Sequence, residues 1–374
     1  MVLTGLVVAE QQRSSAKGWP WLPEQGLVHL GYEHYSIGEA VYLGRGFADP
    51  FRTPSGPTAW MPPLVPIVIA GLLHLADGER LQTAYLFYAL QLFLIGLTLA
   101  LLLREGQRLG VGRFSVPLIV FWCVVLHVPL FFLTHAHPFQ IVAVFLAWKD
   151  LVSQRSAHGY ERRVIASGFV GAFYWLVFPG LGAAWTALTL LKTRQHVGGG
   201  IVAILIAASL VSPWIVRNSV VFGKFIPVKS NAGYEAWQAM QTNNGILHAS
   251  TFAMHPIVYR NQESMEYHRL GESMYLTSKL KQFFSEVKEA PDKYASFTMN
   301  RFFAATVWHE AWRQPEQANE LLMLLYRSSK FLVLFSLVLL LFSRSPLSDD
   351  IKTAVMLWVL ILLPYIVTVH GLRP

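Results

Sequence analysis

A series of long apolar stretches constrains the fold of this chain more than any other feature. A helix needs roughly 20 apolar residues to cross the hydrocarbon core of a bilayer. The runs do not alternate between apolar and polar residues as barrel strands do, so helices are the only way to satisfy their backbone groups in lipid. We therefore predict an all-α polytopic membrane protein with about eight transmembrane helices. The expected spans are residues 81–103, 116–134, 138–152, 164–178, 181–191, 201–216, 331–342 extended backward through 321–326, and 351–369.

Composition supports this class and argues against a nucleic-acid-binding protein. Of the 374 residues, 53% are hydrophobic and only 14% are charged, whereas roughly 25% of a typical soluble protein is charged. Lys and Arg exceed Asp and Glu by 30 to 22, which we attribute to basic cytoplasmic loops rather than to a nucleic-acid partner. The only cysteine, Cys123, lies in an apolar run and is expected to be a packing residue.

Basic residues between the spans predict the orientation of the chain. Cytoplasmic loops carry an excess of Lys and Arg, and every alternation agrees if the following residues are cytoplasmic: Arg104, Arg108, Arg113, Arg155, Arg162, Arg163, Lys192, Arg194, Arg344 and Lys352. The first loop, the turn at His135–His137 and the segment 217–320 then share the outer side. The expected parts are a first outer loop with juxtamembrane helices (1–80), transmembrane helices (81–216), a small extracytoplasmic α-rich segment (217–320) and further transmembrane helices (321–374).

The first outer loop contains two expected helices. A short helix over 36–43 should end at Gly44 and Gly46. The apolar stretch 62–76 opens with prolines and is expected to lie at the membrane surface or half inserted, with a short spanning helix as the alternative. Residues 1–9 are either the remnant of a first membrane helix or a frayed tail.

The long outer segment reads partly as strand and partly as helix. Residues 213–234 contain β-like Val-Val-Phe and Phe-Ile-Pro-Val runs. Amphipathic helices are expected over 262–284 and 291–303.

Glu33 is the first residue that could do chemistry. The catalytic signatures of soluble enzymes, such as a Walker loop or paired cysteines, are missing from the sequence. A carboxylate at the edge of a membrane cavity can take a proton from an acceptor hydroxyl or amine, or hold a divalent cation. The alternative is a solvated glutamate in a loop.

Four further residues are candidates on the same side of the membrane. His135 and His137 could bind metal, bind phosphate when protonated or move protons; otherwise they are interfacial histidines with water partners. Arg217 and Asn218 follow the span 201–216, and the planar fork of Arg suits phosphate. For Arg217 the alternative is snorkelling to the headgroups. Weaker candidates for phosphate are Arg45, Arg52, Lys224 and Lys229, and His309-Glu310 is expected to be a structural interface cluster.

Four stretches resemble the GT-C class of membrane glycosyltransferases, in the group of dolichyl-phosphate-mannose–protein mannosyltransferases and bacterial lipid A aminoarabinose transferases. The specific ones are 35–47 (YSIGEAVYLGRGF) and 57–70 (PTAWMPPLVPIVIA) in the first loop. Residues 213–218 (PWIVRN) and 222–231 (FGKFIPVKSN) look like the junction between a span and the outer domain in bacterial members.

This resemblance implies an inverting transferase in the cell (inner) membrane that moves a sugar from a polyprenyl-phosphate donor to a lipid, glycan or protein acceptor on the extracytoplasmic face. It gives Glu33 the role of acceptor base. The second acid of the family is absent, because its Asp-Pro-Phe-like setting reads His137-Pro138-Phe139. It also implies a chain shortened at both ends. The expected substrate- and phosphate-binding residues are His34, Tyr35, Arg52, His135, His137, Arg217 and Asn218. If a divalent metal ion is used, Glu33 and His137 are its expected ligands.

Two other functions stay open at this point. A transporter or lipid flippase would carry ionisable residues near the middle of its spans, where this sequence has few, His127 being the clearest. A non-catalytic membrane assembly protein descended from a transferase would explain the missing second acid.

Overall fold

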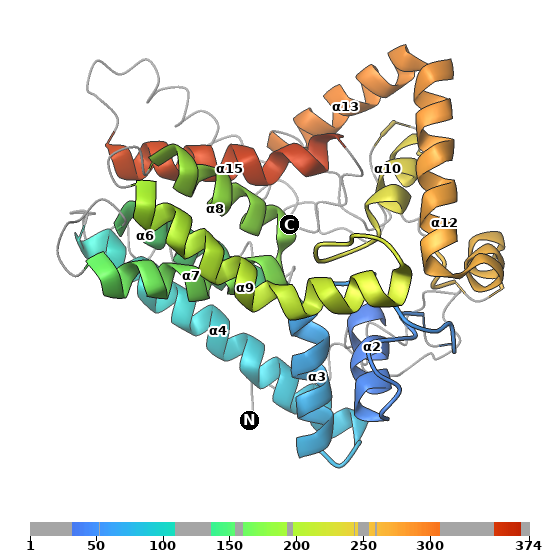
Figure 1. Cartoon of the computed structure of the whole chain (residues 1–374), viewed down its shortest axis with the longest axis horizontal. Coiled ribbons are helices and arrows are strands. Elements are labelled where there is room, and N and C mark those ends of the chain that lie inside the picture. The colour runs from blue at the N-terminus through green and yellow to red at the C-terminus, as the bar shows by residue number, and fades with distance from the viewer. Residues whose placement is uncertain are drawn as a thin grey trace, which may run out of the picture.

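The fold is given by a computed structural model, which describes residues 32–51, 53–108, 136–153, 160–192, 197–242, 244–245, 254–258, 260–306 and 348–367. Helices joined by irregular segments make up this part of the chain. One isolated antiparallel bridge, between Ala48 and Pro57, is the only extended pairing within these ranges. The predicted all-α class is therefore confirmed for them (Figure 1). The helices are α2 (Tyr32–Tyr42), α3 (Leu64–Leu75), α4 (Arg80–Arg108), α6 (His137–Ser153), α7 (Tyr160–Val177), α8 (Pro179–Lys192), α9 (Val197–Phe222), α10 (Ala232–Met240), α12 (Gln262–Glu289), α13 (Pro291–Thr306) and α15 (Asp349–Val367).

Two of the described helices are long and apolar enough to cross a bilayer: Arg80–Arg108 and Gly198–Phe222. Helices also form at the other expected spans in the described ranges, but α7 and α15 begin with charged turns and α6 and α8 are shorter. The 12 residues of α3 extend about 18 Å, well short of the roughly 30 Å hydrocarbon core, so α3 cannot cross the membrane by itself.

Several sequence predictions fall outside the described residues. These are the spans 116–134, 321–326 and 331–342, the segment 1–9, Cys123, His127 and His309-Glu310.

Helices α6, α7, α8, α9 and α15 pack into one bundle around a shared apolar core (Figure 1). Glycines on α7 allow the close approach, as small residues do between membrane helices. A Cβ at Gly168 would lie 2.6 Å from Ile206 of α9, and a Cβ at Gly171 would overlap the ring of Trp185 on α8. The two helices separate where predicted, since α7 ends at Val177 and α8 begins at Pro179.

Charged side chains tie together the helix ends at one pole of this bundle. Glu105, near the end of α4, accepts hydrogen bonds from Arg108 and from Lys149 of α6, the latter at 2.7 Å. Arg108 also reaches Asp350 in the first turn of α15 at 2.9 Å. At the opposite end of α15, the Nε of Arg301 on α13 donates to the Ile366 carbonyl at 2.7 Å. Helix α15 therefore runs from the charged pole to the part of the molecule that contains α13.

A second unit contains α10, α12, α13 and the loop between α2 and α3. Its core is rich in aromatic rings, including Phe51, Trp60, Tyr234, Tyr267 and Tyr275. The helices expected over 262–284 and 291–303 form as α12 and α13, but a kink at Gly271 divides α12 into two pieces. We call this group of elements the outer unit.

Helix α2 joins the outer unit to the bundle because its side chains belong to two cores. Ile37 packs in the core of the outer unit. Tyr35 belongs to a third core, shared with α3, α4, the start of α6 and the end of α7. The predicted short helix is confirmed, and the chain turns after Tyr42 through Gly44 and Gly46, whose φ values are 74° and 75°.

The β-like interpretation of 213–234 is wrong. Helix α9 continues through Val-Val-Phe and ends at Phe222, because these residues extend an apolar helix whose packing overrides their strand propensity. After Gly223, residues 224–230 form an irregular segment, which we call the strap. Ser230 N–H of the strap donates to the Ala59 carbonyl at 2.8 Å.

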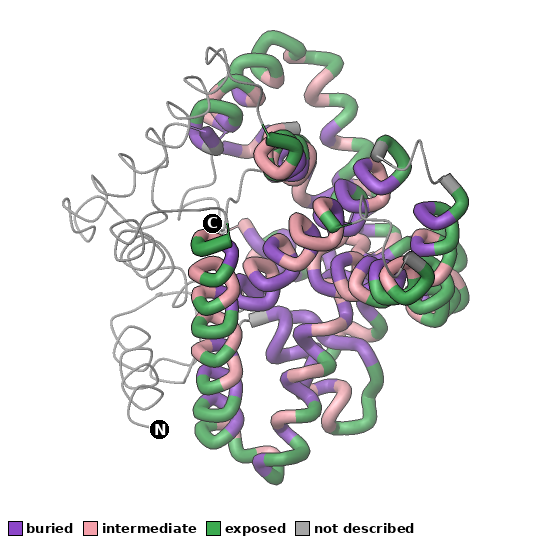
Figure 2. Tube along the Cα trace, turned by 90° about the vertical axis from the view of Figure 1, so that its left-hand side faces the viewer, coloured by how far each residue is buried: buried purple, intermediate pink, exposed green. Residues whose placement is uncertain are grey.

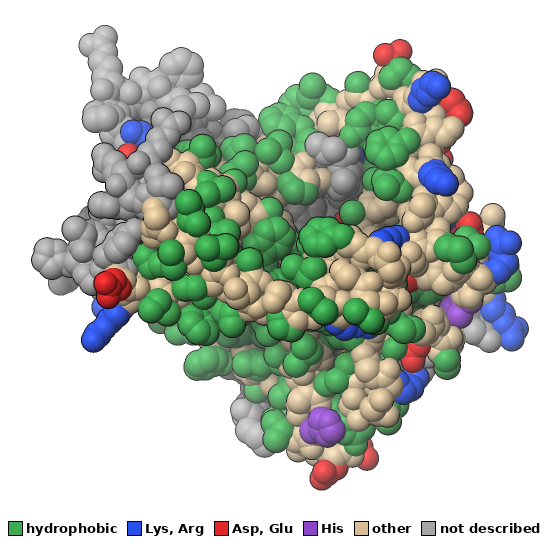
Figure 3. Space-filling view, viewed as in Figure 1, with side chains coloured by type: hydrophobic (Ala, Val, Ile, Leu, Met, Phe, Trp, Pro, Cys, Tyr) green, Lys and Arg blue, Asp and Glu red, His purple; other side chains and the backbone are tan. Residues whose placement is uncertain are grey.

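The surface of the described residues has an apolar side and a charged side. Charged side chains gather over α12 and the neighbouring end of α13, whereas hydrophobic ones cover the face over α7, α8 and α9 (Figure 3). Buried residues concentrate where the helices meet, and α4 keeps a long exposed side (Figure 2). Phe93 of α4, Phe169 of α7 and Leu205 of α9 are among the exposed large hydrophobic residues.

The glycine contact between α7 and α8 can be tested by substitution. Gly171→Ala should destabilise the protein by about 1–3 kcal/mol, because the added methyl group overlaps the buried Trp185 ring. Gly96→Ala is the matched control, since a Cβ on this α4 glycine meets nothing. Thermal unfolding in detergent measures both, and equal midpoints for the two variants would contradict the packing described.

Candidate functional site

Glu33 lies in a buried pair with His255. Glu33 is in the first turn of α2 and is 3% exposed. Its Oε1 lies 3.6 Å from Nε2 of His255, which belongs to the segment 254–258 of the outer unit. Ile257 N–H donates to Nδ1 of His255 at 3.2 Å, so Nδ1 presents a lone pair. In the neutral imidazole the proton is then on Nε2 and faces the carboxylate.

Aromatic edges surround the imidazole of His255. Phe51, Trp60 and Tyr234 approach it nearly perpendicularly, with ring centroids 5.6, 5.8 and 5.4 Å away. The Tyr234 hydroxyl is buried and has no hydrogen-bond partner among the described residues. Burial, helped by the charges of Glu263, Glu33 and Glu235, raises the pKa of Tyr234 well above its ordinary value, so the phenol stays neutral. The pair is thus buried among aromatic rings.

A buried lysine lies deeper in the outer unit. Lys279 is 2% exposed and contacts Glu263 and Glu266, with Nζ–Oε2 separations of 2.6 and 3.0 Å. Its ammonium also lies 4.2 Å from the centre of the Trp237 ring, within cation–π range. Tyr275 donates to Glu263 at 2.6 Å. Two carboxylates balance the charge of Lys279, and an aromatic ring covers its ammonium. We therefore assign this lysine a structural role in the outer unit.

Glu272 connects three separate segments of the outer unit. From the loop between α2 and α3, the Thr58 hydroxyl donates to it, and Ala59 N–H does so at 2.7 Å. Ser230 of the strap donates at 2.7 Å, and Tyr267 of α12 at 2.9 Å. Complete burial raises the pKa of Glu272 above its ordinary value, although these four donors act in the opposite direction.

Arg217 donates hydrogen bonds to the first loop. Its Nη1 donates to the Thr58 carbonyl at 2.6 Å and its Nη2 to the Phe47 carbonyl at 2.7 Å. Asn218 accepts from Nη1 at 3.0 Å and donates to the Ile226 carbonyl at 3.2 Å. Arg217 therefore meets the first loop, as expected from its predicted sidedness, but through backbone carbonyls, whereas Asn218 contacts the strap. Phosphate binding by them stays a prediction.

The other described site residues lie on α2 or at the start of α6. His34 is buried. Tyr35 donates to Glu39 at 3.1 Å, and the Arg80 guanidinium lies 4.6 Å from the centre of its ring. His137 is buried at the start of α6, and the neighbouring Ala136 shares a core with Tyr35. The structure thus brings the start of α6 next to α2.

The structure leaves two of the predicted phosphate-binding residues and the predicted metal site untested. Arg52 and His135 lie outside the described residues. Within the described ranges, no group of three or more His, Cys, Asp or Glu side chains is placed to hold a metal ion. Metal binding by Glu33 and His137 stays a prediction.

Sequence reasoning missed His255, Glu272 and Lys279. Glu272 follows Gly271, whose φ of 72° interrupts α12. The glycine inside a helical pattern was therefore an available signal that the backbone bends next to this acid. Lys279 is one of several charges in an amphipathic helix, and His255 stands in an irregular segment; neither has a local signal of burial.

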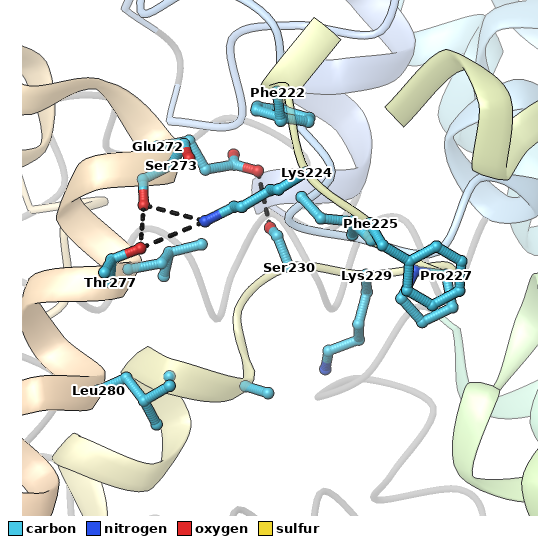
Figure 4. Close-up of a pocket in the computed structure, with 14 residues that line it drawn as sticks. Phe222, Lys224, Phe225, Pro227, Lys229, Ser230, Glu272, Ser273, Thr277 and Leu280 are labelled. Carbon is cyan, nitrogen blue, oxygen red and sulfur yellow. Dashed lines mark hydrogen bonds between the residues drawn. The ribbon is translucent and has the colours of Figure 1, made fainter. Parts of the chain in front are cut away.

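An open pocket of about 260 Å³ lies beside Glu272, between the strap and α12 (Figure 4). The strap contributes Lys224, Phe225 and Lys229 to its lining, and α12 contributes Thr277 and Leu280. Lys224 Nζ reaches across to the Ser273 carbonyl and the Thr277 hydroxyl, at 3.2 and 3.3 Å.

Comparisons with protein-family models, curated proteins and solved structures found no match to this chain.

Glu272→Ala should destabilise the protein strongly. Each buried donor left without an acceptor costs about 1–3 kcal/mol, and several are left, so we expect a loss of about 3 kcal/mol or more. Glu289→Ala, at an exposed position of the same helix, is the control and should change little. Thermal unfolding in detergent provides the measurement, and a midpoint like that of the control would show that the hydrogen bonds to Glu272 contribute nothing to stability.

The raised pKa of Glu272 predicts the direction of a pH effect. Between the ordinary and the raised pKa, the folded protein keeps a proton that the unfolded chain has lost. The stability that the protein gains from the raised pKa of Glu272 is therefore full below the unfolded pKa. It is lost as the pH rises through the folded pKa. Compared with Glu272→Gln, the unmodified protein should lose thermal stability as the pH is raised above the ordinary glutamate pKa of about 4.3. Parallel pH profiles of the two proteins would contradict this assignment.

Proposed function

We propose that this chain is a polytopic membrane glycosyltransferase that moves a sugar from a polyprenyl-phosphate donor to an acceptor on the outer face of the membrane. The observation that carries the proposal is the buried Glu33–His255 pair. It joins the first loop, whose residues resemble GT-C transferases, to the outer unit. The end of the candidate span α9 meets the same loop through Arg217.

The proposed membrane arrangement has about eight spans, with the outer unit on the extracytoplasmic side of the cell membrane. Exposed apolar residues on α4, α7 and α9 support a lipid-facing bundle. The pole with Glu105, Arg108 and Lys149 is then cytoplasmic. Spans 116–134 and 331–342 complete the count from the sequence.

In the proposed reaction, Glu33 acts as a general base toward an acceptor hydroxyl or amine. As the acceptor atom bonds to the anomeric carbon of the sugar, its proton passes to the Glu33 carboxylate. The bond between the anomeric carbon and the phosphate oxygen breaks, and its electron pair leaves with the lipid phosphate. The Nε2–H of His255 faces Glu33 and orients the carboxylate for the transfer. Since Glu33 is buried, the proposal requires that substrate binding opens a path to it.

Arg217 is proposed to assist the leaving phosphate. A guanidinium has five N–H donors, and three contacts with Phe47, Thr58 and Asn218 leave two of them for an anion. A positive group near the developing charge stabilises the transition state. His34, Tyr35, Arg52, His135, His137 and Asn218 complete the proposed substrate-binding set.

Two alternatives have different support. A non-catalytic assembly protein is favoured by the absent second acid at His137 and by the backbone contacts of Arg217. The helix bundle gives little support to a transporter, which would need an ionisable residue available for its cargo. Asp150 of α6 accepts hydrogen bonds from Ser167 and Trp185, at 2.8 and 2.7 Å, and these bonds join helices.

Glu33→Gln should reduce sugar transfer by about 100-fold or more, because an amide cannot accept the proton. Transfer is measured with the full chain in membranes supplied with several polyprenyl-phosphate sugars. Glu79→Gln is the control, since this exposed glutamate follows α3, away from the pair.

The outcomes separate the candidate functions. Full activity of Glu33→Gln would remove this residue from the mechanism. Absence of transfer by the unmodified protein with every donor would favour the assembly protein. Protein level and detergent extraction of each variant show whether it has inserted and folded.

A further inference from the structure

The pocket between the strap and α12 has an apolar rim and basic walls (Figure 4). Phe225 on the strap is 73% exposed, and Leu280 and Phe284 on α12 are also exposed. Large apolar side chains gathered beside an open polar pocket are expected where a protein meets lipid rather than bulk water.

Two lysines supply the positive charge of the pocket. Lys224 contacts a carbonyl and a hydroxyl, and no carboxylate lies within ion-pair distance of it among the described residues. Lys229 is paired with Glu235 at 2.8 Å. Glu272 also lines the pocket, but the four donors described above already occupy its oxygens. Its carboxylate is turned toward Ser230 in Figure 4, so the ammonium of Lys224 is the charge without a counter-ion.

The position of the pocket along α9 gives its depth. Gly198–Phe222 is a candidate span of 25 residues, so it extends about 37 Å and exceeds the roughly 30 Å hydrocarbon core. Lys224 follows this helix by two residues. If α9 crosses the bilayer, the pocket therefore lies at the level of the lipid headgroups, where phosphates are concentrated.

We infer that the pocket formed by Lys224, Lys229, Ser273 and Thr277 binds the phosphate headgroup of an anionic membrane phospholipid, with its acyl chains against Phe225 and Leu280. The lipid acts as a resident anchor that holds the strap against α12. This site is separate from the Glu33–His255 pair, which does not line the pocket. The inference requires only that α9 lies in a membrane, and it stands whether or not the chain transfers sugar.

Phospholipid binding to the purified full chain in neutral detergent tests the inference. Native mass spectrometry compares phosphatidylglycerol with phosphatidylcholine. We expect phosphatidylglycerol to bind more tightly, and the double variant Lys224→Gln/Lys229→Gln to weaken it by about tenfold or more. Lys281→Gln/Lys288→Gln removes two exposed lysines from α12 outside the pocket and should leave binding unchanged.

Competition distinguishes the sources of phosphate. Soluble glycerol phosphate should not displace phosphatidylglycerol, because it lacks acyl chains; displacement would make this a site for free phosphate and overturn the inference. Displacement by a polyprenyl phosphate at equal concentration would overturn it too, since the pocket would then belong to the donor site. Equal binding of both phospholipids, or equal loss in the control variant, would also overturn it. Single Lys224→Gln, at an exposed position, supplies a second variant if the double one does not fold.

Discussion

The buried carboxylate of Glu272 is the interaction on which the arrangement of the outer unit depends. A charge without water is costly unless its oxygens receive hydrogen bonds. Here the donors come from the first loop, the strap and α12, so satisfying one carboxylate fixes three segments that are far apart in the sequence. Gly271 permits the backbone to turn, with a φ of 72°, directly before this acid.

Arg217 extends the same connection into the bundle. Its guanidinium lies at the end of α9 and donates to the Phe47 and Thr58 carbonyls, while Glu272 receives the Thr58 hydroxyl. One residue of the loop is therefore held from both sides. Helix α2 ends just before this loop, and its Ile37 packs into the core of the outer unit, so the contacts that hold the loop also bear on the helix that carries Glu33.

The proposed active site and the proposed lipid pocket are separate, because neither Glu33 nor His255 lines the pocket. Glu33 and His255 are enclosed by aromatic rings, whereas the pocket opens between Phe225 and α12. The strap contacts α12 twice at the pocket, since Ser230 donates to Glu272 and Lys224 donates to the Ser273 carbonyl. A lipid stabilises a conformation only when it binds that conformation more tightly than the others. Lipid at the strap therefore stabilises the contacts of Glu272 with the first loop if it binds most tightly to the conformation that has these contacts.

The sequence by itself determined the helical class, the short α2 with its glycine turn, the break between α7 and α8, and the helices α12 and α13. These features follow from local periodicity, proline and glycine, which act within a few residues. Only the tertiary structure decided that Val-Val-Phe continues α9, that Arg217 binds carbonyls, and that His255 faces Glu33. The partners in each of these contacts are far apart along the chain, and nothing in the local pattern of His255, Glu272 or Lys279 specifies burial. Their roles depend on which donors and rings the packed helices bring to them.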